Sequence, residues 1–428
     1  AEEFARAGLR TLAVARRWVG EGEFEAWRAR FAEASARVHG RDAAVETACE
    51  ELERGLEAVG ATGVEDALGE GVPETVGALR QAGVRVWMLT GDKRSTAVQV
   101  AHACGLAKPE PEGLTLTIRG EEEVEVARSV DGCVAALRGR ASRLRHVTVV
   151  VDSASFYLAL GSRRRELLSA CLSVRAVVCC RFTPTQKADL ACLVKEHGLR
   201  CLAVGDGGND VGMIQAAHVG VGISGREGLQ AARAGDFAVA RFSSLSRLVL
   251  VHGRQAYLRT CFIAQFSFYK SMIVCATQVL FNLAFTGASG ASLFDSFSLM
   301  AYNVLYTAAP VMGYVFDRDM PEALALANPH VLRGARRGEA LSARTAAGWL
   351  ALGVAHAALA LAVAAGAADP AAGCGRAELG ATALSGALAA QTATLLLRGH
   401  TFNAVQAGAV AGSWGAFVAA GGGGGPGG

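Results

Sequence analysis

Long apolar runs in the second half of the chain constrain its fold more than any other feature. Cys261–Phe285 and Phe294–Phe316 each exceed the roughly 20 residues that a membrane-spanning helix needs. Thr345–Ala367, Leu379–Leu397 and the weaker Ala404–Ala420 follow them. The sequence ahead of these runs is mixed and charged. It therefore predicts a water-soluble head followed by about five transmembrane helices, with a glycine-rich tail at 421–428.

Arginines gather in alternate connections between the apolar runs. They are Arg254 and Arg259 before the first run, Arg333, Arg336, Arg337 and Arg344 after the second, and Arg398 after the fourth. By the positive-inside rule, these connections and the head face the cytosol. A multi-pass protein of the plasma membrane or an endomembrane is expected. The net charge of +3 is too small to favour a nucleic-acid partner.

Short apolar runs alternate with helical patterns along the head. The expected strands are Val84–Thr90, Val147–Val151, Ala176–Cys180, Cys201–Val204, Val219–Ile223 and Phe237–Ala240. This alternation predicts an α/β doubly wound parallel sheet with right-handed crossovers. Glu21 to about Val59 is expected to be helical, and Lys108 to about Ala141 is expected to be irregular.

Polar residues follow three of these strands where each one ends. They are Thr90-Gly91-Asp92, Thr183-Pro184 with Lys187, and Gly205-Asp206. In an open α/β sheet, ligands bind at the carboxyl ends of the strands. We expect these residues to converge on a phosphoryl group, with Lys187 neutralising charge and Thr90 and Gly91 donating hydrogen bonds.

The turn after Gly205 carries three polar side chains, Asp206, Asn209 and Asp210, among glycines. Hard oxygen ligands in this arrangement suit Mg2+. An ordinary strand, turn and capped helix is the plain alternative for this segment. A solvated lysine in the first turn of a helix is the corresponding alternative for Lys187.

One lysine lies inside the first apolar run, in Phe266-Ser-Phe-Tyr-Lys-Ser271. An ionisable group at that depth costs a few kcal/mol and marks a candidate functional site, unless Lys270 reaches the interface. Lys270 and Asn303 suit an anionic cargo group such as a phosphate. Pro310 is expected to break the second run and free backbone groups to face a cavity.

Several motifs together resemble the P-type ATPases. Met88-Leu-Thr-Gly-Asp-Lys93, Cys179-Cys-Arg-Phe-Thr-Pro-Thr-Gln-Lys187 and Val204-Gly-Asp-Gly-Gly-Asn-Asp-Val211 resemble their phosphorylation-domain motifs. Val251-His-Gly-Arg254, Phe268-Tyr-Lys270 and Tyr302-Asn-Val-Leu-Tyr-Thr307 resemble the phospholipid-transporting (type IV, lipid flippase) subfamily.

This resemblance implies a haloacid-dehalogenase-like head that uses ATP and Mg2+ to drive phospholipid from the outer or lumenal leaflet to the cytosolic one. Phosphoryl contacts would come from Thr90, Gly91 and Lys187. The other nucleotide contacts would be Arg10, Asp92, Arg181, Asn209 and Asp210. Asp206 and Asp210 would hold Mg2+, Lys270 and Asn303 would line the lipid path, and an accessory membrane subunit is a possible partner.

The implied domains are 1–60, the end of the nucleotide-binding domain; 61–255, the phosphorylation domain; and 256–420, the transmembrane helices. The Asp-Lys-Thr-Gly-Thr segment that carries the phosphorylated aspartate does not occur. The chain is therefore expected to be a C-terminal fragment that does not turn over ATP by itself. Three alternatives stay open: a cation-transporting P-type ATPase, a truncated membrane scaffold, and a soluble-type phosphatase fused to unrelated spans.

Overall fold

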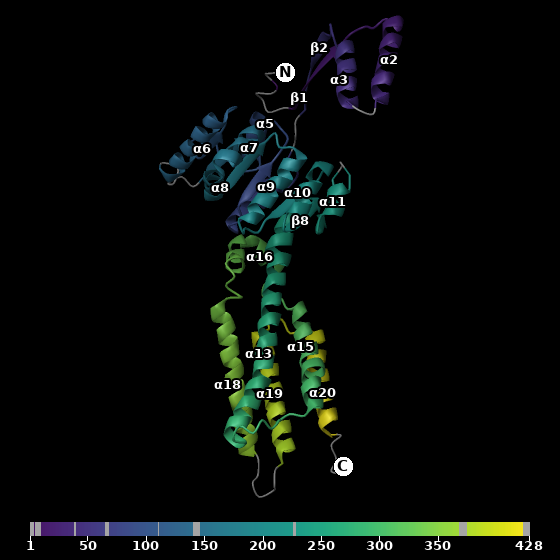
Figure 1. The fold of residues 1–428 in the computed structure, drawn as a ribbon. Coiled ribbons are helices and arrows are strands. Elements are labelled where there is room, and N and C mark those ends of the chain that lie inside the picture. Colours follow the sequence, from purple (N-terminus) through teal and green to yellow (C-terminus); the bar gives the residue numbers. More distant parts are fainter. Residues whose placement is uncertain are drawn as a thin grey trace. The chain divides into compact units, whose positions relative to one another are not determined.

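The computed structural model describes residues 4, 10–37, 40–64, 68–109, 111–139, 146–225, 228–367 and 375–422. The chain divides into two compact units. Unit 1 holds Ala1–Gly77 and Arg85–Phe242, and unit 2 holds Ala78–Val84 and Ser243–Gly428 (Figure 1). These units divide at 242/243, just before a helical segment of 42 residues, Ser244–Phe285, that continues into the first span.

Unit 1 begins with a two-stranded antiparallel sheet of β1 (Arg10–Arg16) and β2 (Glu57–Val64), with α2 (Glu21–Ala36) and α3 (Arg41–Leu52) between them. The sequence predicted helix from Glu21 to about Val59, but the residues from Glu57 onward form a strand instead. Glu57–Val64 has a weak strand pattern of its own and forms a strand by pairing with β1, which is a tertiary effect.

The rest of unit 1 is the predicted α/β domain. In chain order its elements are α4 (Val72–Gln81, which crosses into unit 2), β3 (Val86–Leu89), α5 (Arg94–Ala103), β4 (Leu114–Ile118), α6 (Glu123–Arg138), β5 (Val147–Asp152), α7 (Ser153–Ser162), α8 (Arg164–Ser173), β6 (Ala176–Cys180), α9 (Pro184–Glu196), β7 (Leu202–Gly205), η2 (Gly208–Asp210), α10 (Val211–Ala216), β8 (Val219–Ile223), α11 (Gln230–Ala234) and β9 (Phe237–Val239).

These strands are parallel, as predicted, but they form two sheets. Their orders are β3-β6-β5-β4 and β7-β8-β9. All five residues of β6 are buried, which explains why Ala176–Cys180 is a continuous apolar run. The α/β fold class is confirmed.

The expectation that Lys108–Ala141 is irregular was wrong. This segment contains β4 and α6, and α6 buries Val126, Val130 and Cys133 at helical spacing. That spacing was present in the sequence, but the charged residues around it obscured it.

Unit 2 is helical. It contains α12 (Ser244–Arg247), the π-helix η3 (Leu248–Gly253), α13 (Arg254–Phe285), α14 (Ser296–Ala301), the π-helix η4 (Tyr302–Tyr306), α15 (Ala308–Gly313), η5 (Tyr314–Phe316), α16 (Glu322–Ala327), η6 (Pro329–Val331), α17 (Leu332–Arg336), α18 (Ala343–Ala367), α19 (Arg376–Arg398) and α20 (Ala404–Gly422). In the described part of the chain, four helical segments are long and apolar enough to span a membrane. They are Ser244–Phe285, Ser296–Phe316, Ala343–Ala367 and Arg376–Arg398, and the shorter Ala404–Ala420 is also apolar.

The second span is interrupted near Pro310, as expected. Proline has no backbone N–H, and its ring crowds the carbonyl four residues earlier, here that of Tyr306. The π-helix η4 ends at Tyr306, and Thr307, between η4 and α15, has a φ of −118°, which is more extended than in a regular helix. Pro310 therefore accounts for the change in helix type at this depth.

Asp317, just beyond the second span, joins that span to the connection between α19 and α20. Only 4% of Asp317 is exposed. Its Oδ1 accepts from the His400 amide at 2.9 Å and the Thr401 hydroxyl at 2.9 Å, and its Oδ2 lies 3.0 Å from His400 Nδ1. Burial alone raises the pKa of Asp317, but the hydrogen bonds from Thr401 and His400 outweigh it and lower the pKa below its usual value.

We predict that Asp317→Asn lowers the stability of the chain by about 1–3 kcal/mol at pH 7, because the buried amide cannot accept all of these hydrogen bonds. Since the pKa is lower in the folded state, the carboxylate stabilises the fold above its unfolded pKa. This contribution is lost as the pH falls through the folded value.

Thermal unfolding of the detergent-solubilised chain at several pH values measures the difference. Glu322→Gln, which removes an exposed ion pair with Arg247, is the control and is expected to change little. A gap between wild type and Asp317→Asn that does not shrink below about pH 4 contradicts the prediction.

Candidate functional site

The loops after β3 and β6 are joined by backbone hydrogen bonds. The Phe182 amide donates to the Thr90 carbonyl at 3.0 Å, and the Arg181 amide donates to the Asp92 carbonyl at 3.1 Å. The Thr90 hydroxyl donates to Asp92 Oδ2 at 2.9 Å and accepts from the Asp92 amide at 3.1 Å. Two of the three predicted strand-end clusters therefore do meet. In this state the Thr90 hydroxyl is engaged by Asp92, while Gly91 is exposed.

Arg181 has a left-handed backbone, with φ 57°. Such a conformation is uncommon for a residue with a Cβ and persists where the surroundings determine it, often at functional sites. Here the hydrogen bonds of Arg181 and Phe182 to the β3 loop hold it. Its side chain is exposed, and its Nε lies 4.0 Å from the Asp152 carboxylate.

Helix α9 positions Lys187. Thr183 caps the helix, and the Gln186 side chain returns the hydrogen bond to the Thr183 amide, so the first turn is fixed at both ends. Lys187 is the next residue and is only 9% exposed. Its Nζ lies 2.8 Å from Asp210 Oδ1. The structure thus differs from the alternative of a solvated lysine and joins the second strand-end cluster to the third.

The third cluster follows β7. A Cβ on Gly205 would lie 2.3 Å from the Asp210 Cβ, so only glycine allows Asp210 to pack there. Asp206 and Asn209 are exposed. The Asp206 carboxylate makes no hydrogen bond or ion pair within the described part of the chain.

These residues fit Mg2+, which binds through one or two carboxylates and completes its octahedron with water and phosphate oxygens. Asp206 offers an open carboxylate, and Asp210 lies at the other end of the same turn. No group of three or more His, Cys, Asp or Glu side chains placed to hold a metal occurs among the described residues.

Two side chains at these strand ends were not predicted. Asp152 ends β5 and lies near Arg181. Gln230 reaches over the glycine turn, because a Cβ on Gly208 would lie 2.3 Å from its Oε1. Asp152 could have been found, since it ends a buried strand as Asp206 does. Gln230 has no such signal in the sequence.

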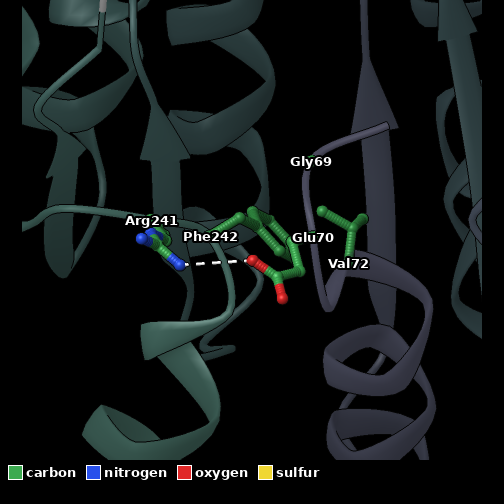
Figure 2. A pocket seen from close by; sticks show the side chains of 5 residues that line it. All are labelled: Gly69, Glu70, Val72, Arg241 and Phe242. Atoms are coloured by element: carbon green, nitrogen blue, oxygen red, sulfur yellow. Dashed lines mark hydrogen bonds and ion pairs between the residues drawn. The ribbon is translucent and has the colours of Figure 1, made fainter. Parts of the chain in front are cut away.

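The predicted site residues do not line the pocket in Figure 2. That pocket is formed by Gly69, Glu70, Val72, Arg241 and Phe242, and an exposed ion pair of 3.3 Å joins Arg241 to Glu70. Its one cationic side chain, Arg241, is paired with Glu70, and the predicted phosphoryl-binding residues are not in its lining. Arg10 begins β1, but its side chain is outside the described residues.

In unit 2, Lys270 turns inward. Its Nζ donates to the Thr307 hydroxyl at 3.0 Å, and Thr307 is fully buried beside the interrupted part of the second span. Thr307 in turn lies 3.4 Å from the Asn303 carbonyl. The Asn303 side chain is exposed and bonds to the Leu299 carbonyl of its own helix. Lys270 therefore does not reach away from the bundle, and it is linked to Asn303 only through Thr307.

Comparison with known proteins decides the family. The model of the phospholipid-translocating P-type ATPase C-terminal region matches residues 232–421, and the haloacid dehalogenase-like hydrolase model matches residues 2–125. Phospholipid-transporting ATPase 2 of Arabidopsis thaliana is 46% identical over 356 residues, which are 83% of this chain and 32% of that protein. Phospholipid-transporting ATPase DRS2 of Saccharomyces cerevisiae is 37% identical over 366 residues, which are 84% of this chain and 27% of that protein.

The chain belongs to the phospholipid-translocating P-type ATPase family. It is a multi-pass integral membrane protein with a haloacid-dehalogenase-like head. It spans 32% of the first of these two relatives and 27% of the second. The resemblance to this family is thereby confirmed.

We predict that Gly205→Ala lowers the stability of this P-type ATPase head by about 1–3 kcal/mol, because the added Cβ overlaps Asp210 and pushes it away from Lys187. The matched control is Gly212→Ala, whose Cβ would meet only the Ala188 Cβ at 3.6 Å. Replacing a helical glycine in α10 there is expected to be neutral or to stabilise by up to about 1 kcal/mol.

A thiol-reactive maleimide dye measures the melting temperature in both variants. Cys179 and Cys180 are buried in the centre of the sheet, and burial raises the pKa of Cys180 to about 11. Both thiols are therefore protonated and shielded until the head unfolds. Equal melting temperatures for Gly205→Ala and Gly212→Ala would show that the close approach of Gly205 to Asp210 does not matter.

Proposed function

We propose that this chain is the C-terminal part of an ATP-driven phospholipid translocase that moves lipid from the outer or lumenal leaflet to the cytosolic leaflet through an aspartyl-phosphate cycle. The proposal is carried by one observation. The ends of β3, β6 and β7 are tied together by the Thr90–Phe182 hydrogen bond and the Lys187–Asp210 ion pair. Both relatives compared above carry the name phospholipid-transporting ATPase.

Each strand end has a role in this proposal. Lys187 places a nearly buried ammonium where it neutralises charge on a transferred phosphoryl group, and Thr90 and the Gly91 amide donate hydrogen bonds to its oxygens. For this, the Thr90 hydroxyl would give up its hydrogen bond to Asp92 Oδ2 and donate to a phosphoryl oxygen instead. Mg2+, when bound, would neutralise phosphate charge, and Asp206 and Asp210 would hold it.

Three further residues would contact the nucleotide or its phosphates, namely Arg10, Arg181 and Asn209. Arg181 and Asn209 are exposed, so both are accessible to a ligand from solvent. The chain lacks the segment with the phosphorylated aspartate. The isolated chain is therefore expected to form no acid-stable phosphoenzyme from labelled ATP.

The membrane unit favours an anionic cargo group. The four spans carry no aspartate or glutamate except Glu378, in the first turn of α19. A route for metal cations would place carboxylates at mid-depth, whereas this unit places the Lys270 ammonium there. Among the described residues, Thr307 accepts one hydrogen bond from that ammonium, which has three donors, and we assign the others to a lipid phosphate. Asn303 would lie along the same path.

The remaining parts of the proposal concern orientation and partners. By the positive-inside rule, arginine-rich connections face the cytosol. The head is followed directly by Arg254 and Arg259 at the start of the first span, so it would lie in the cytosol too. The substrate is a phospholipid taken from the surrounding bilayer. An accessory membrane subunit is a further proposed partner, and no nucleic-acid partner is proposed.

We predict that Lys270→Ala, in the full-length protein that carries this chain, raises the half-saturating lipid concentration by about 10- to 100-fold, the effect of losing a charge-assisted hydrogen bond. The measurements are lipid-stimulated ATP hydrolysis and uptake of a fluorescent phospholipid. Ser267→Ala is the matched control, because Ser267 lies one turn earlier on α13, is exposed and bonds only to its own helix.

The head is tested in the same assay by Asp206→Asn. This variant is expected to reduce ATP turnover about 100-fold or more while leaving the half-saturating lipid concentration unchanged, since the amide is a poor Mg2+ ligand. Normal turnover by Asp206→Asn would refute the magnesium assignment. Normal lipid dependence in Lys270→Ala would refute the lipid path.

A further inference from the structure

Hydrogen bonds between buried polar side chains join α13, η4, α18 and α19 within unit 2. Tyr269 and Tyr302 are 0% and 1% exposed, and Gln391 and Thr394 are 3% and 6% exposed. A polar group in an apolar interior is costly unless it is hydrogen-bonded. The partners of these four side chains therefore define how the helices fit together.

The first set of bonds runs from α18 through α13 to α19. Thr394 donates its one hydroxyl proton to the Ala390 carbonyl at 2.7 Å. The Tyr269 hydroxyl oxygen lies 3.0 Å from Thr394 Oγ1 and 2.6 Å from His356 Nδ1. Whichever atom of each pair is the donor, Tyr269 joins His356 of α18 to Thr394 of α19.

The second set runs from α19 through η4 to α13. The Tyr302 hydroxyl lies 2.7 Å from Gln391 Oε1 and 3.1 Å from the carbonyl of Lys270, so its proton is shared between two acceptors. Gln391 thus holds Tyr302, and Tyr302 holds the α13 backbone at Lys270.

Tyr269 and Lys270 are consecutive residues of α13, and their side chains point about 100° apart around the helix. Fixing the Tyr269 side chain between α18 and α19 therefore fixes the direction of Lys270. The Lys270 ammonium then meets Thr307 at 3.0 Å. A rotation of α13 that released Tyr269 would also carry Lys270 away from the interrupted span.

We propose that His356, Gln391 and Thr394 are positioning residues for Lys270. They hold α13 and η4 in the rotation that presents the Lys270 ammonium to the phosphate of a phospholipid. This inference rests on the proposed function, since it assigns these residues to the same lipid path. They act through Tyr269 and Tyr302 and do not themselves contact the lipid.

The test uses Thr394→Val, which removes the hydroxyl and keeps the shape, in the full-length protein. The half-saturating concentration of phosphatidylserine in mixed micelles is expected to rise about three- to tenfold, the size of one lost hydrogen bond, while the ATP KM stays unchanged. Thr394→Ser keeps the hydroxyl and is expected to restore the wild-type value. Thr382→Val is the matched control, because Thr382 lies on the same helix, is exposed and bonds only to the Glu378 carbonyl.

A double variant separates positioning from general stability. In a Lys270→Ala background, Thr394→Val is expected to cause no further rise, because there is no ammonium left to position. A full additional rise in the double variant overturns the inference, since Thr394 would then act independently. If Lys270→Ala raises the half-saturating concentration and Thr394→Val does not, the inference is wrong and the proposed lipid path stands. If Lys270→Ala has no effect, the proposed lipid path itself is wrong.

His356→Phe gives a second route if Thr394→Val does not fold. His356 is only half-buried, so a ring of similar size is accommodated while the bond to Tyr269 is lost. It is expected to show the same three- to tenfold rise, consistent with one hydrogen bond. A folded His356→Phe with wild-type lipid dependence overturns the inference.

Discussion

The Lys187–Asp210 ion pair is the interaction on which the head depends. Lys187 follows β6 in one sheet, and Asp210 follows β7 in the other, so the pair joins two sheets that share no strand pairing in the described residues. Both side chains are largely withdrawn from water, at 11% and 14% exposure. Removing either partner would leave a nearly buried charge without compensation, which is far more costly than losing a surface pair.

The same pair explains why glycine stands at position 205 and why Asp206 remains open. Asp210 packs directly against Gly205, and this close approach directs its carboxylate to Lys187. Asp206, at the other end of the turn, makes no such bond and stays exposed. One turn thus supplies a carboxylate in an ion pair and an exposed carboxylate.

In unit 2, side-chain hydrogen bonds likewise join separate elements. Tyr269, Lys270 and Tyr302 each make a side-chain hydrogen bond to another helix. In an apolar interior each bond has few competing partners, so a small number of them sets the rotation of a long helix. Arg333 and Arg336 of α17 also donate to the carbonyls of Gln81 and Ala82 at the end of α4, but these arginines are exposed.

The sequence by itself determined the parallel α/β head, the long apolar helices, and the residues at three strand ends, because each depends on local pattern and on motif chemistry. It did not determine β2, which needs β1 beside it, nor the division of the strands into two sheets. Only the tertiary structure showed that Asp210 is bound to Lys187 while Asp206 is exposed, and that Lys270 contacts Thr307 and Tyr302. These are contacts between residues far apart in the chain, and no local pattern encodes which of several similar side chains finds a partner.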